Sequence, residues 1–184
     1  IPEKNVFLIG GTNGKGTTTS ILEQLFRKSG YKTGAFTSPH LTQYNERVRI
    51  NLNHSSDKDW ISAFETIENV RGDIPLTYFE FSALAAFQIL SNCDCDAWLI
   101  EVGLGGRLDA TNIIESSVSL LTSIAMDHEE WLGDSIDKIA TEKVGIAKMN
   151  RPLIFGDLVA VDEIKKGCFE KGAELRRKEH DFKG

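Results

Sequence analysis

The sequence lacks the features that mark several common classes of protein. Its three cysteines, Cys93, Cys95 and Cys168, form no C-x-x-C pair, so neither a disulfide framework nor a zinc site is expected. No apolar run approaches the roughly eighteen residues of a membrane span, and no signal peptide opens the chain. With 21 Lys and Arg against 27 Asp and Glu, the net charge of -6 argues against a nucleic-acid module. We expect a cytoplasmic protein with reduced thiols.

What remains is the composition of an ordinary globular domain. The 184 residues are 41% hydrophobic and 26% charged, which suits one domain with a full hydrophobic core. The chain begins without Met and finishes in a highly charged stretch, residues 170–184, where no strand is expected. We therefore expect a piece of a longer protein.

The first forty residues alternate strand and helix. Residues 6–9 are an apolar run that ends in glycines, typical of a strand buried on both faces. Residues 17–29 place apolar side chains on one helical face, with Gly30 as the stop, and a second strand is expected within residues 32–38. This order predicts a βαβ unit, with parallel strands joined by a right-handed crossover.

The remaining chain continues the alternation after one interruption. Residues 38–53 are predicted to form a long surface loop with at most one short strand. Hydrophobic patterns then predict helices over 56–70, 77–91, 135–148 and 161–172, and strands over 97–102, 117–125 and 151–156. The whole pattern predicts an α/β fold, with a largely parallel sheet flanked by helices.

The stretch GGTNGKGTTTS, residues 10–20, resembles a P-loop without matching it. A P-loop has Ser or Thr after its lysine, whereas Gly16 follows Lys15 here. The position between a strand and a helix favours phosphate binding by backbone N–H groups and Lys15 over a glycine turn with a solvated lysine. The hydroxyl that a P-loop offers to magnesium would come from Thr17 or from elsewhere.

Three further polar residues follow predicted strands, where ligands gather in open α/β sheets. Glu101 ends a buried strand, which suits a magnesium ligand, although strand-end acids are also common at the surface. His128, beside three acids, can serve as a metal ligand or an acid–base group, or can lie at the surface. Ser38 can complete a metal shell or simply cap a turn.

Lys143 lies on the apolar face of a predicted helix, with Ile136, Ala140 and Ala147 at helical spacing. Such a lysine usually snorkels, with its stem packed and its ammonium in water. The alternative is a buried lysine whose pKa is lowered, so that its neutral amine can react.

Together these motifs resemble one family. The segments GTNGKGT, TSPHL, NERVRI, EVGLGGRLDATN, DHEEWLG and EKVGIAK occur in this order within residues 6–154. They are similar to the ATP-binding, central domain of the folylpolyglutamate synthase/dihydrofolate synthase family, part of the Mur ligase superfamily with its P-loop NTPase-like fold. The glycine loop is shared across Mur ligases, whereas TSPHL, NERVRI and GGRLDATN narrow the resemblance to the folate branch.

The resemblance implies an ATP-dependent ligase. Such enzymes phosphorylate a folate or dihydropteroate carboxylate with ATP, and the amine of L-glutamate then displaces phosphate to form an amide. The nucleotide phosphates would be held by Thr12, Asn13, Gly14, Lys15, Gly16 and Thr17. Ser38, Glu101 and His128 would bind two magnesium ions, and Lys143 would carry a metal-binding carbamate. Lys15, Lys143 and His128 would be the catalytic residues.

The resemblance also implies the rest of the site. The pterin or folate pocket would be lined by Thr77, Phe79, Glu80, Asp109 and Ala110, and residues 39–50 would cover it. A monovalent cation is compatible with the family's chemistry. Family members carry a second, C-terminal domain for glutamate and nucleotide binding, so this chain by itself is expected to be an inactive fragment of a monomeric enzyme.

Three rival functions stay open. Another Mur ligase, acting on a UDP-muramoyl substrate, would share the glycine loop but not the TSPHL and NERVRI segments. A P-loop ATPase without ligase chemistry would have no use for an inward-facing Lys143, and an inert structural domain would bind no Mg-ATP. Within the folate branch, dihydropteroate and tetrahydrofolate substrates are not separable, and a bifunctional enzyme is the expectation.

Overall fold

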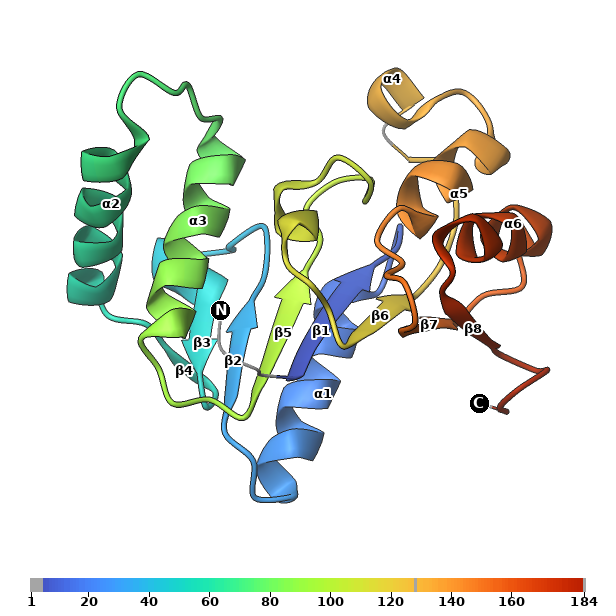
Figure 1. The fold of residues 1–184 in the computed structure, drawn as a ribbon. Helices are drawn as coiled ribbons and strands as arrows, with labels where there is room; N and C mark the ends of the chain where they lie inside the picture. Colours follow the sequence, from blue (N-terminus) through green and yellow to red (C-terminus); the bar gives the residue numbers. More distant parts are fainter. Residues whose placement is uncertain (1–4, 128, 184) are drawn as a thin grey trace.

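The computed structural model describes residues 5–127 and 129–183. Its centre is an eight-stranded sheet with helices on both faces (Figure 1). The strands are β1 Asn5–Gly10, β2 Thr33–Phe36, β3 Val48–Ile50, β4 Asn53–His54, β5 Ala97–Glu101, β6 Val118–Leu121, β7 Pro152–Phe155 and β8 Glu174–Arg177. Their order across the sheet is β4-β3-β2-β5-β1-β6-β7-β8.

The sheet is largely parallel, which confirms the predicted fold class. Every neighbouring pair from β2 to β8 in this order is parallel, and β3 and β4 run antiparallel at one edge. The opening βαβ unit needs one correction, because β1 and β2 are parallel but not adjacent. β5 lies between them and pairs with both, so a strand from much later in the chain completes the unit.

Helices cover both faces of the sheet. They are α1 Lys15–Lys28, α2 Asp57–Arg71, α3 Tyr78–Ser91, α4 Glu129–Leu132, α5 Ile136–Val144 and α6 Val161–Lys171, with 3-10 turns η1 Tyr44–Arg47 and η2 Ala110–Ile113. All but the short α4 were predicted. α2 begins after Ser56 because its hydroxyl accepts a hydrogen bond from the Asp59 amide. Among the described residues, no helix has the length and apolar character needed to cross a membrane.

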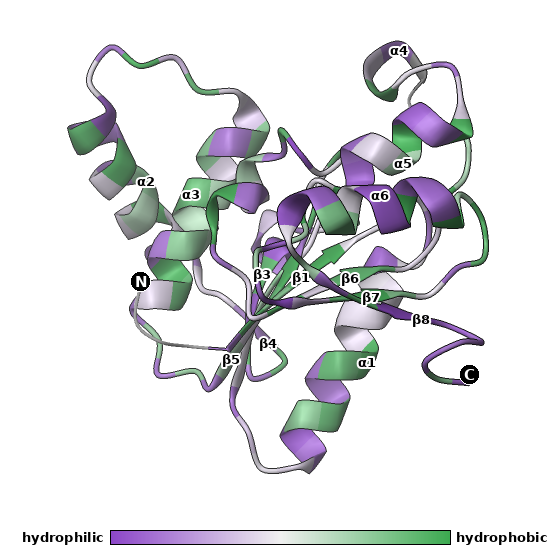
Figure 2. Cartoon of the chain, turned by 45° about the vertical axis from the view of Figure 1, so that its right-hand side comes forward, coloured by the Kyte–Doolittle hydropathy of each residue, from purple (hydrophilic) through white to green (hydrophobic). Residues whose placement is uncertain are grey.

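The side chains of β1 alternate between two unequal layers of core. Val6 and Leu8 face a large apolar layer that α2, α3, α5 and α6 complete. Phe7 and Ile9 point the other way, into a smaller layer that α1 covers. Figures 1 and 2 show α1 on its own side of the sheet, where its N-terminal end reaches the edge at which β1 finishes.

The segment 38–53, expected to be a loop with at most one strand, holds two short strands. β3 pairs antiparallel with β2, and β4 pairs antiparallel with β3. Val48 is buried in the larger core layer, while Arg49 bonds to the buried Glu23 carboxylate in α1. The sequence does not predict that Arg49 lies in a strand, because the carboxylate that pairs with it belongs to α1, far away in the sequence.

The charged C-terminal stretch contains a strand, which corrects the expectation that it has none. β8 pairs in parallel with β7, and Leu153 lies opposite Leu175 in register. Figure 2 shows this segment as mostly hydrophilic. Charged side chains suit an edge strand because they discourage pairing with another chain. Backbone pairing, rather than an apolar run, therefore defines β8.

The Glu23–Arg49 ion pair generates a prediction about stability. Glu23 is 1% exposed, and its carboxylate accepts hydrogen bonds from Nε and Nη2 of Arg49. Glu23→Ala leaves the guanidinium without its anion, so we expect the free energy of unfolding to fall by about 3 kcal/mol. Urea denaturation measures this change.

The matched control is Glu68→Ala, which removes the partner of Arg71 from an exposed pair on α2. We expect no measurable change in stability there because exposed ion pairs contribute little. Equal losses in the two variants would contradict the role given to the buried pair.

Candidate active site

The carboxyl ends of four adjacent strands form the edge that carries the candidate site. β2, β5, β1 and β6 are consecutive in the sheet and parallel. Ile9 lies opposite Glu101 in register, so the glycine loop after β1 begins beside the last residue of β5. Ser38 follows β2, and residues 122–127 follow β6. The stretches that the sequence singles out therefore meet at one edge.

The glycine loop is fastened to the end of β6. Gly11 has a φ of 136°, and a Cβ atom there would lie 2.0 Å from Oγ1 of Thr122, so a side chain does not fit. The Thr12 amide donates to the Ser123 carbonyl at 2.8 Å, and the Asn13 amide donates to the Ser123 hydroxyl at 3.0 Å. These two amides, which the resemblance assigns to phosphate, are used to hold the loop.

The start of α1 keeps amides that are available to an anion. Gly14 precedes the helix with a φ of 86°, and α1 has no side-chain cap. The first helical hydrogen bond runs from the Thr18 amide to the Gly14 carbonyl, so in the described part of the chain the amides of residues 15–17 have no acceptor. Lys15 bends back over the loop, with Nζ 2.9 Å from the Gly11 carbonyl oxygen. A helix end with such a lysine is suited to binding phosphate.

The Glu101 carboxylate is buried at the end of β5. It is 5% exposed, and its Oε2 accepts a hydrogen bond from the Ser38 amide at 3.2 Å. No basic side chain among the described residues forms an ion pair with it. Burial raises the pKa of its carboxyl group, and the Ser38 amide and the charges of Lys15 and Arg49 offset only part of that effect.

Lys143 is buried rather than snorkelling, which decides between the two sequence interpretations. It is 2% exposed and lies near the end of α5. Burial, followed by the positive charge of Lys15, lowers the pKa of its amine to about 8, while Asp127 opposes the shift. Because the charge of Lys15 acts on both Glu101 and Lys143, all three side chains border the same region.

The loop after β5, residues 103–109, holds α5 in this position. The Arg107 amide donates to the Glu142 carbonyl at 2.9 Å, and the two side chains form an ion pair at 2.9 Å. A Cβ atom on Gly145 would lie 2.4 Å from Cβ of Arg107, so the two backbones are in contact. α5 ends at Val144, before the expected residue 148, and Lys143 in its last turn is buried.

The donors at this edge suit magnesium, which prefers oxygen ligands. Glu101 and the backbone of Ser38 lie together, whereas His128 is outside the described residues. Among the side chains that the structure describes, no three of His, Cys, Asp or Glu gather into a metal site. The described protein groups thus include a buried carboxylate, that of Glu101, with no basic side chain of the described residues paired with it.

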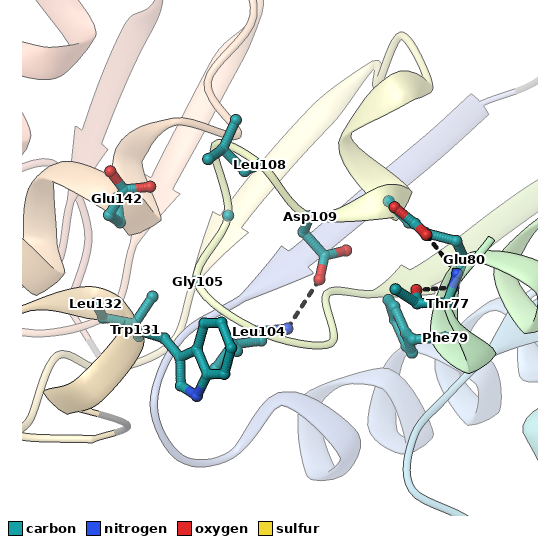
Figure 3. Close-up of a pocket in the computed structure, with 12 residues that line it drawn as sticks. Thr77, Phe79, Glu80, Leu104, Gly105, Leu108, Asp109, Trp131, Leu132 and Glu142 are labelled. Carbon is teal, nitrogen blue, oxygen red and sulfur yellow. Dashed lines mark hydrogen bonds between the residues drawn. The ribbon is translucent and has the colours of Figure 1, made fainter. Parts of the chain in front are cut away.

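A cavity of about 240 Å³ lies between the start of α3, the loop after β5, and α4 (Figure 3). The five residues assigned to the folate pocket all line it: Thr77, Phe79, Glu80, Asp109 and Ala110. Sequence positions that are far apart therefore form one cavity, and the binding of a folate there stays a prediction. Phe79 and Leu104 contribute apolar surface, and Glu80 and Asp109 contribute carboxylates.

Three of these pocket residues also maintain the local backbone. Thr77 and Glu80 bond reciprocally as the capping box of α3. Asp109 accepts hydrogen bonds from the Leu104 amide at 2.8 Å and from the Thr111 amide at 2.9 Å. The polar side chains around the cavity are therefore held rigidly by the protein itself.

The Mur ligase middle domain family matches residues 9–173. The match includes the glycine loop, the buried Glu101 and Lys143, and the residues that line the cavity. The chain belongs to this family. It spans about two-fifths of the length of the curated relatives it resembles, since it covers 42% of the Escherichia coli protein described next.

Relatives of this Mur ligase domain include folate enzymes. The domain is 45% identical over 177 residues to the dihydrofolate synthase/folylpolyglutamate synthase of Escherichia coli (strain K12), with 96% of this chain covered. The structure of E. coli FolC in complex with DHPP and ADP has a TM-score of 0.94 and 44% identity, covering 96% of this chain and 42% of that chain.

A second solved structure carries other ligands. It is a bifunctional folylpolyglutamate synthase/dihydrofolate synthase with Mn, AMPPNP and L-glutamate bound, with a TM-score of 0.93 and 43% identity, covering 98% of this chain and 44% of that chain. Together with the family match, these likenesses confirm the fold that was predicted for the Mur ligase domain.

Sequence reasoning missed one wall of the cavity in this Mur ligase domain. Leu104, Leu108 and Trp131 line it, and the Trp131 side chain is 76% exposed. Figure 3 shows the Trp131 indole beside Leu104 and across from Phe79. Trp131 lies within the DHEEWLG motif, but a sequence does not reveal that a tryptophan is exposed beside a cavity.

The burial of Lys143 in the Mur ligase domain generates a prediction about pH. Its pKa of about 8 lies below the ordinary 10.5, so its charged form destabilises the folded state fully below pH 8, and the effect disappears as the pH rises to 10.5. Lys143→Met removes this cost. We expect the free energy of unfolding at pH 7 to rise by up to about 3 kcal/mol, with no gain near pH 10.5.

Chemical denaturation at the two pH values measures the effect. Lys138→Met is the control, because that lysine lies in the same helix with its side chain 64% exposed. It should change stability little at either pH. A Lys143→Met protein that is less stable than the parent at pH 7 would contradict the inferred cost of burial.

Proposed function

We propose that the whole protein joins L-glutamate to a folate or dihydropteroate carboxylate with ATP, as a bifunctional dihydrofolate synthase/folylpolyglutamate synthase. This chain would carry the Mg-ATP site and much of the folate site. The observation that carries the proposal is the convergence of an anion-binding helix end, the buried Glu101 carboxylate and the buried Lys143 amine at one sheet edge. The similarity to folate ligases supports it.

In this reaction the γ-phosphoryl group of ATP passes to a carboxylate oxygen of the acid, giving an acyl phosphate and ADP. The amine of L-glutamate attacks the acyl carbon and loses a proton, and phosphate leaves as the amide forms. Transfer between anions needs charge neutralisation and alignment more than covalent help. Lys15 and the unpaired amides of residues 15–17 would bind the phosphate oxygens, while Thr12 and Asn13 keep the loop in shape.

Glu101, Ser38 and His128 would hold the magnesium ions. Burial without a paired cation makes the Glu101 carboxylate a favourable site for a divalent ion, because the ion would stabilise its charged form. When bound, magnesium would neutralise negative charge on the phosphate and carboxylate oxygens. The presence of Mn with AMPPNP in a related structure is consistent with this assignment.

Lys143 would provide a further oxygen ligand as a carbamate. With a pKa of about 8, its amine is neutral in an appreciable fraction of molecules near neutral pH. The neutral amine adds to CO₂, forming an N–C bond and releasing a proton, so that a buried cation becomes an anion. The nearby charge of Lys15, which disfavours the ammonium, would favour this carbamate.

The cavity in Figure 3 would take the ring system of the acid substrate. Phe79 and Trp131 would contact the flat faces of the rings, and Thr77, Glu80, Asp109 and Ala110 would surround their polar edges. The monovalent cation, the monomeric full-length enzyme and the cytoplasmic location stay predictions, as does the inactivity of this chain by itself.

Phosphate release by the full-length protein tests the proposed reaction. ATP, dihydropteroate and L-glutamate together should give turnover, and omission of any one should abolish it. Glu101→Gln should lower kcat/KM roughly a hundred- to a thousandfold, because a buried charge that acts on the transition state is lost. Turnover with a UDP-muramoyl acceptor instead would assign another Mur ligase activity, and ATP hydrolysis without any acceptor would indicate an ATPase.

A pair of substitutions tests the carbamate. Lys143→Ala should lower kcat roughly a hundredfold or more, and added formate or acetate should restore part of it, because a small carboxylate can occupy the vacated space. Lys143→Met fills that space and should not be rescued. Equal responses of the two variants to formate, or wild-type activity that is unchanged after removal of CO₂ and bicarbonate, would contradict the carbamate.

A further inference from the structure

Arg47 is a buried cation with no carboxylate beside it. It is the last residue of η1 and is 5% exposed. Its Nε donates to Nδ1 of His40 at 2.9 Å. Within residues 5–127 and 129–183, its two terminal amino groups have neither a hydrogen-bond acceptor nor an ion-pair partner. Four of its five N–H donors are therefore unused, although buried charges in proteins normally have partners.

Arg49, two residues later in the same segment, differs from Arg47 because each of its side-chain nitrogens donates a hydrogen bond. Its three nitrogen groups donate to the Glu23 carboxylate, the Thr37 hydroxyl and the Glu46 carbonyl. The fold thus provides an acceptor for each of the three side-chain nitrogens of Arg49 and for only one of those of Arg47. Arg49 has a structural role that the protein completes internally, and Arg47 does not.

Two tyrosine rings flank the Arg47 guanidinium. Its central carbon lies 5.3 Å from the ring centroid of Tyr44 and 5.4 Å from that of Tyr78. Aromatic faces attract a cation, but they do not take the in-plane hydrogen bonds that a guanidinium fork donates. The Tyr44 hydroxyl is already bonded to Oγ of Ser82 at 2.7 Å. The rings therefore orient the fork and leave it open to a planar anion.

The open fork reaches the surface next to the candidate site. Arg47 is 5% exposed, and both of its terminal amino groups contribute to that exposed area, because neither is a fully buried atom without a partner. His40, which Arg47 contacts, lies two residues after Ser38 at the strand-end site. Tyr78 immediately precedes Phe79, which lines the cavity. The side chains that contact Arg47 thus come from chain segments that adjoin both the strand-end site and the cavity.

We propose that Arg47 binds a carboxylate of a substrate through its two terminal amino groups. A planar, bidentate pair with a carboxylate is the interaction for which a guanidinium is best shaped. The inference rests on the proposed ligase function, which offers two sources of carboxylate: the acid that is activated and L-glutamate. The chemistry at Arg47 is the same for both sources, and the experiment separates them.

Steady-state kinetics of the full-length protein test the inference. Arg47→Gln removes the charge and the fork, and KM for one carboxylate substrate should rise roughly ten- to a hundredfold, with little change in KM for ATP. A rise for dihydropteroate assigns the acid, and a rise for L-glutamate assigns the amino acid. Arg47→Lys keeps a point charge without the fork and should give an intermediate KM.

Two controls separate binding from a structural role. Arg71→Gln makes the same change in an exposed pair on α2 and should leave every kinetic constant unaltered. An analogue of the identified substrate with a carboxamide in place of the bound carboxylate should bind the wild-type and Arg47→Gln proteins equally by calorimetry. The analogue is dihydropteroate amide for the acid, and glutamine or isoglutamine, according to which carboxylate is bound, for L-glutamate.

Three outcomes would overturn the inference. One is an equal loss of affinity for the carboxylate and its carboxamide, and another is a fall in kcat with both KM values unchanged. The third is an Arg47→Gln protein with wild-type kinetics. Each of these leaves the ligase function standing, because the wild-type protein still turns over, whereas a wild-type protein without turnover on any folate and glutamate would refute that function and the inference with it.

Discussion

Parallel pairing of β2, β5, β1 and β6 is the constraint on which the candidate site depends. Parallel strands finish at the same edge of a sheet, so the glycine loop, Ser38, Glu101 and residues 122–127 meet although the chain separates them widely. The two unequal core layers also fix the positions of the helices that reach this edge of the sheet. α1 covers its own face and places its N-terminal amides at the edge, and α5, packed on the other face, brings Lys143 there.

Buried charge distinguishes the parts of this molecule that support the fold from those that prepare a site. Glu23 and Arg49 are buried as a complete pair, which ties α1 to β3. Glu101, Lys143 and Arg47 are buried without an ion pair to any described residue, and the pKa values of the first two move in the directions that burial dictates. A fold keeps such costly groups where ligands, metals or covalent modification can satisfy them.

Much of the fold could be predicted from local pattern, and what was missed has identifiable physical causes. Apolar periodicity predicted the main helices, and apolar runs predicted the parallel core strands. One short strand was expected within residues 38–53 and two are present. The second was missed because charged side chains such as Arg49, which is paired with Glu23 of α1, hide the strand pattern in this segment. β8 was missed because it lies at an edge, where backbone pairing and not burial defines the strand.

The sequence by itself determined the class of fold, the glycine loop and the residue types at the strand ends, because these depend on local pattern and on motifs that match a known family. The tertiary structure alone decided three other matters: that Lys143 is buried, that Trp131 lines the cavity, and that Arg49 has a carboxylate partner while Arg47 has none among the described residues. The burial and ion pairing of a side chain depend on which distant segments come together. The strand order of the sheet brings them together, and no single segment of the sequence determines that order.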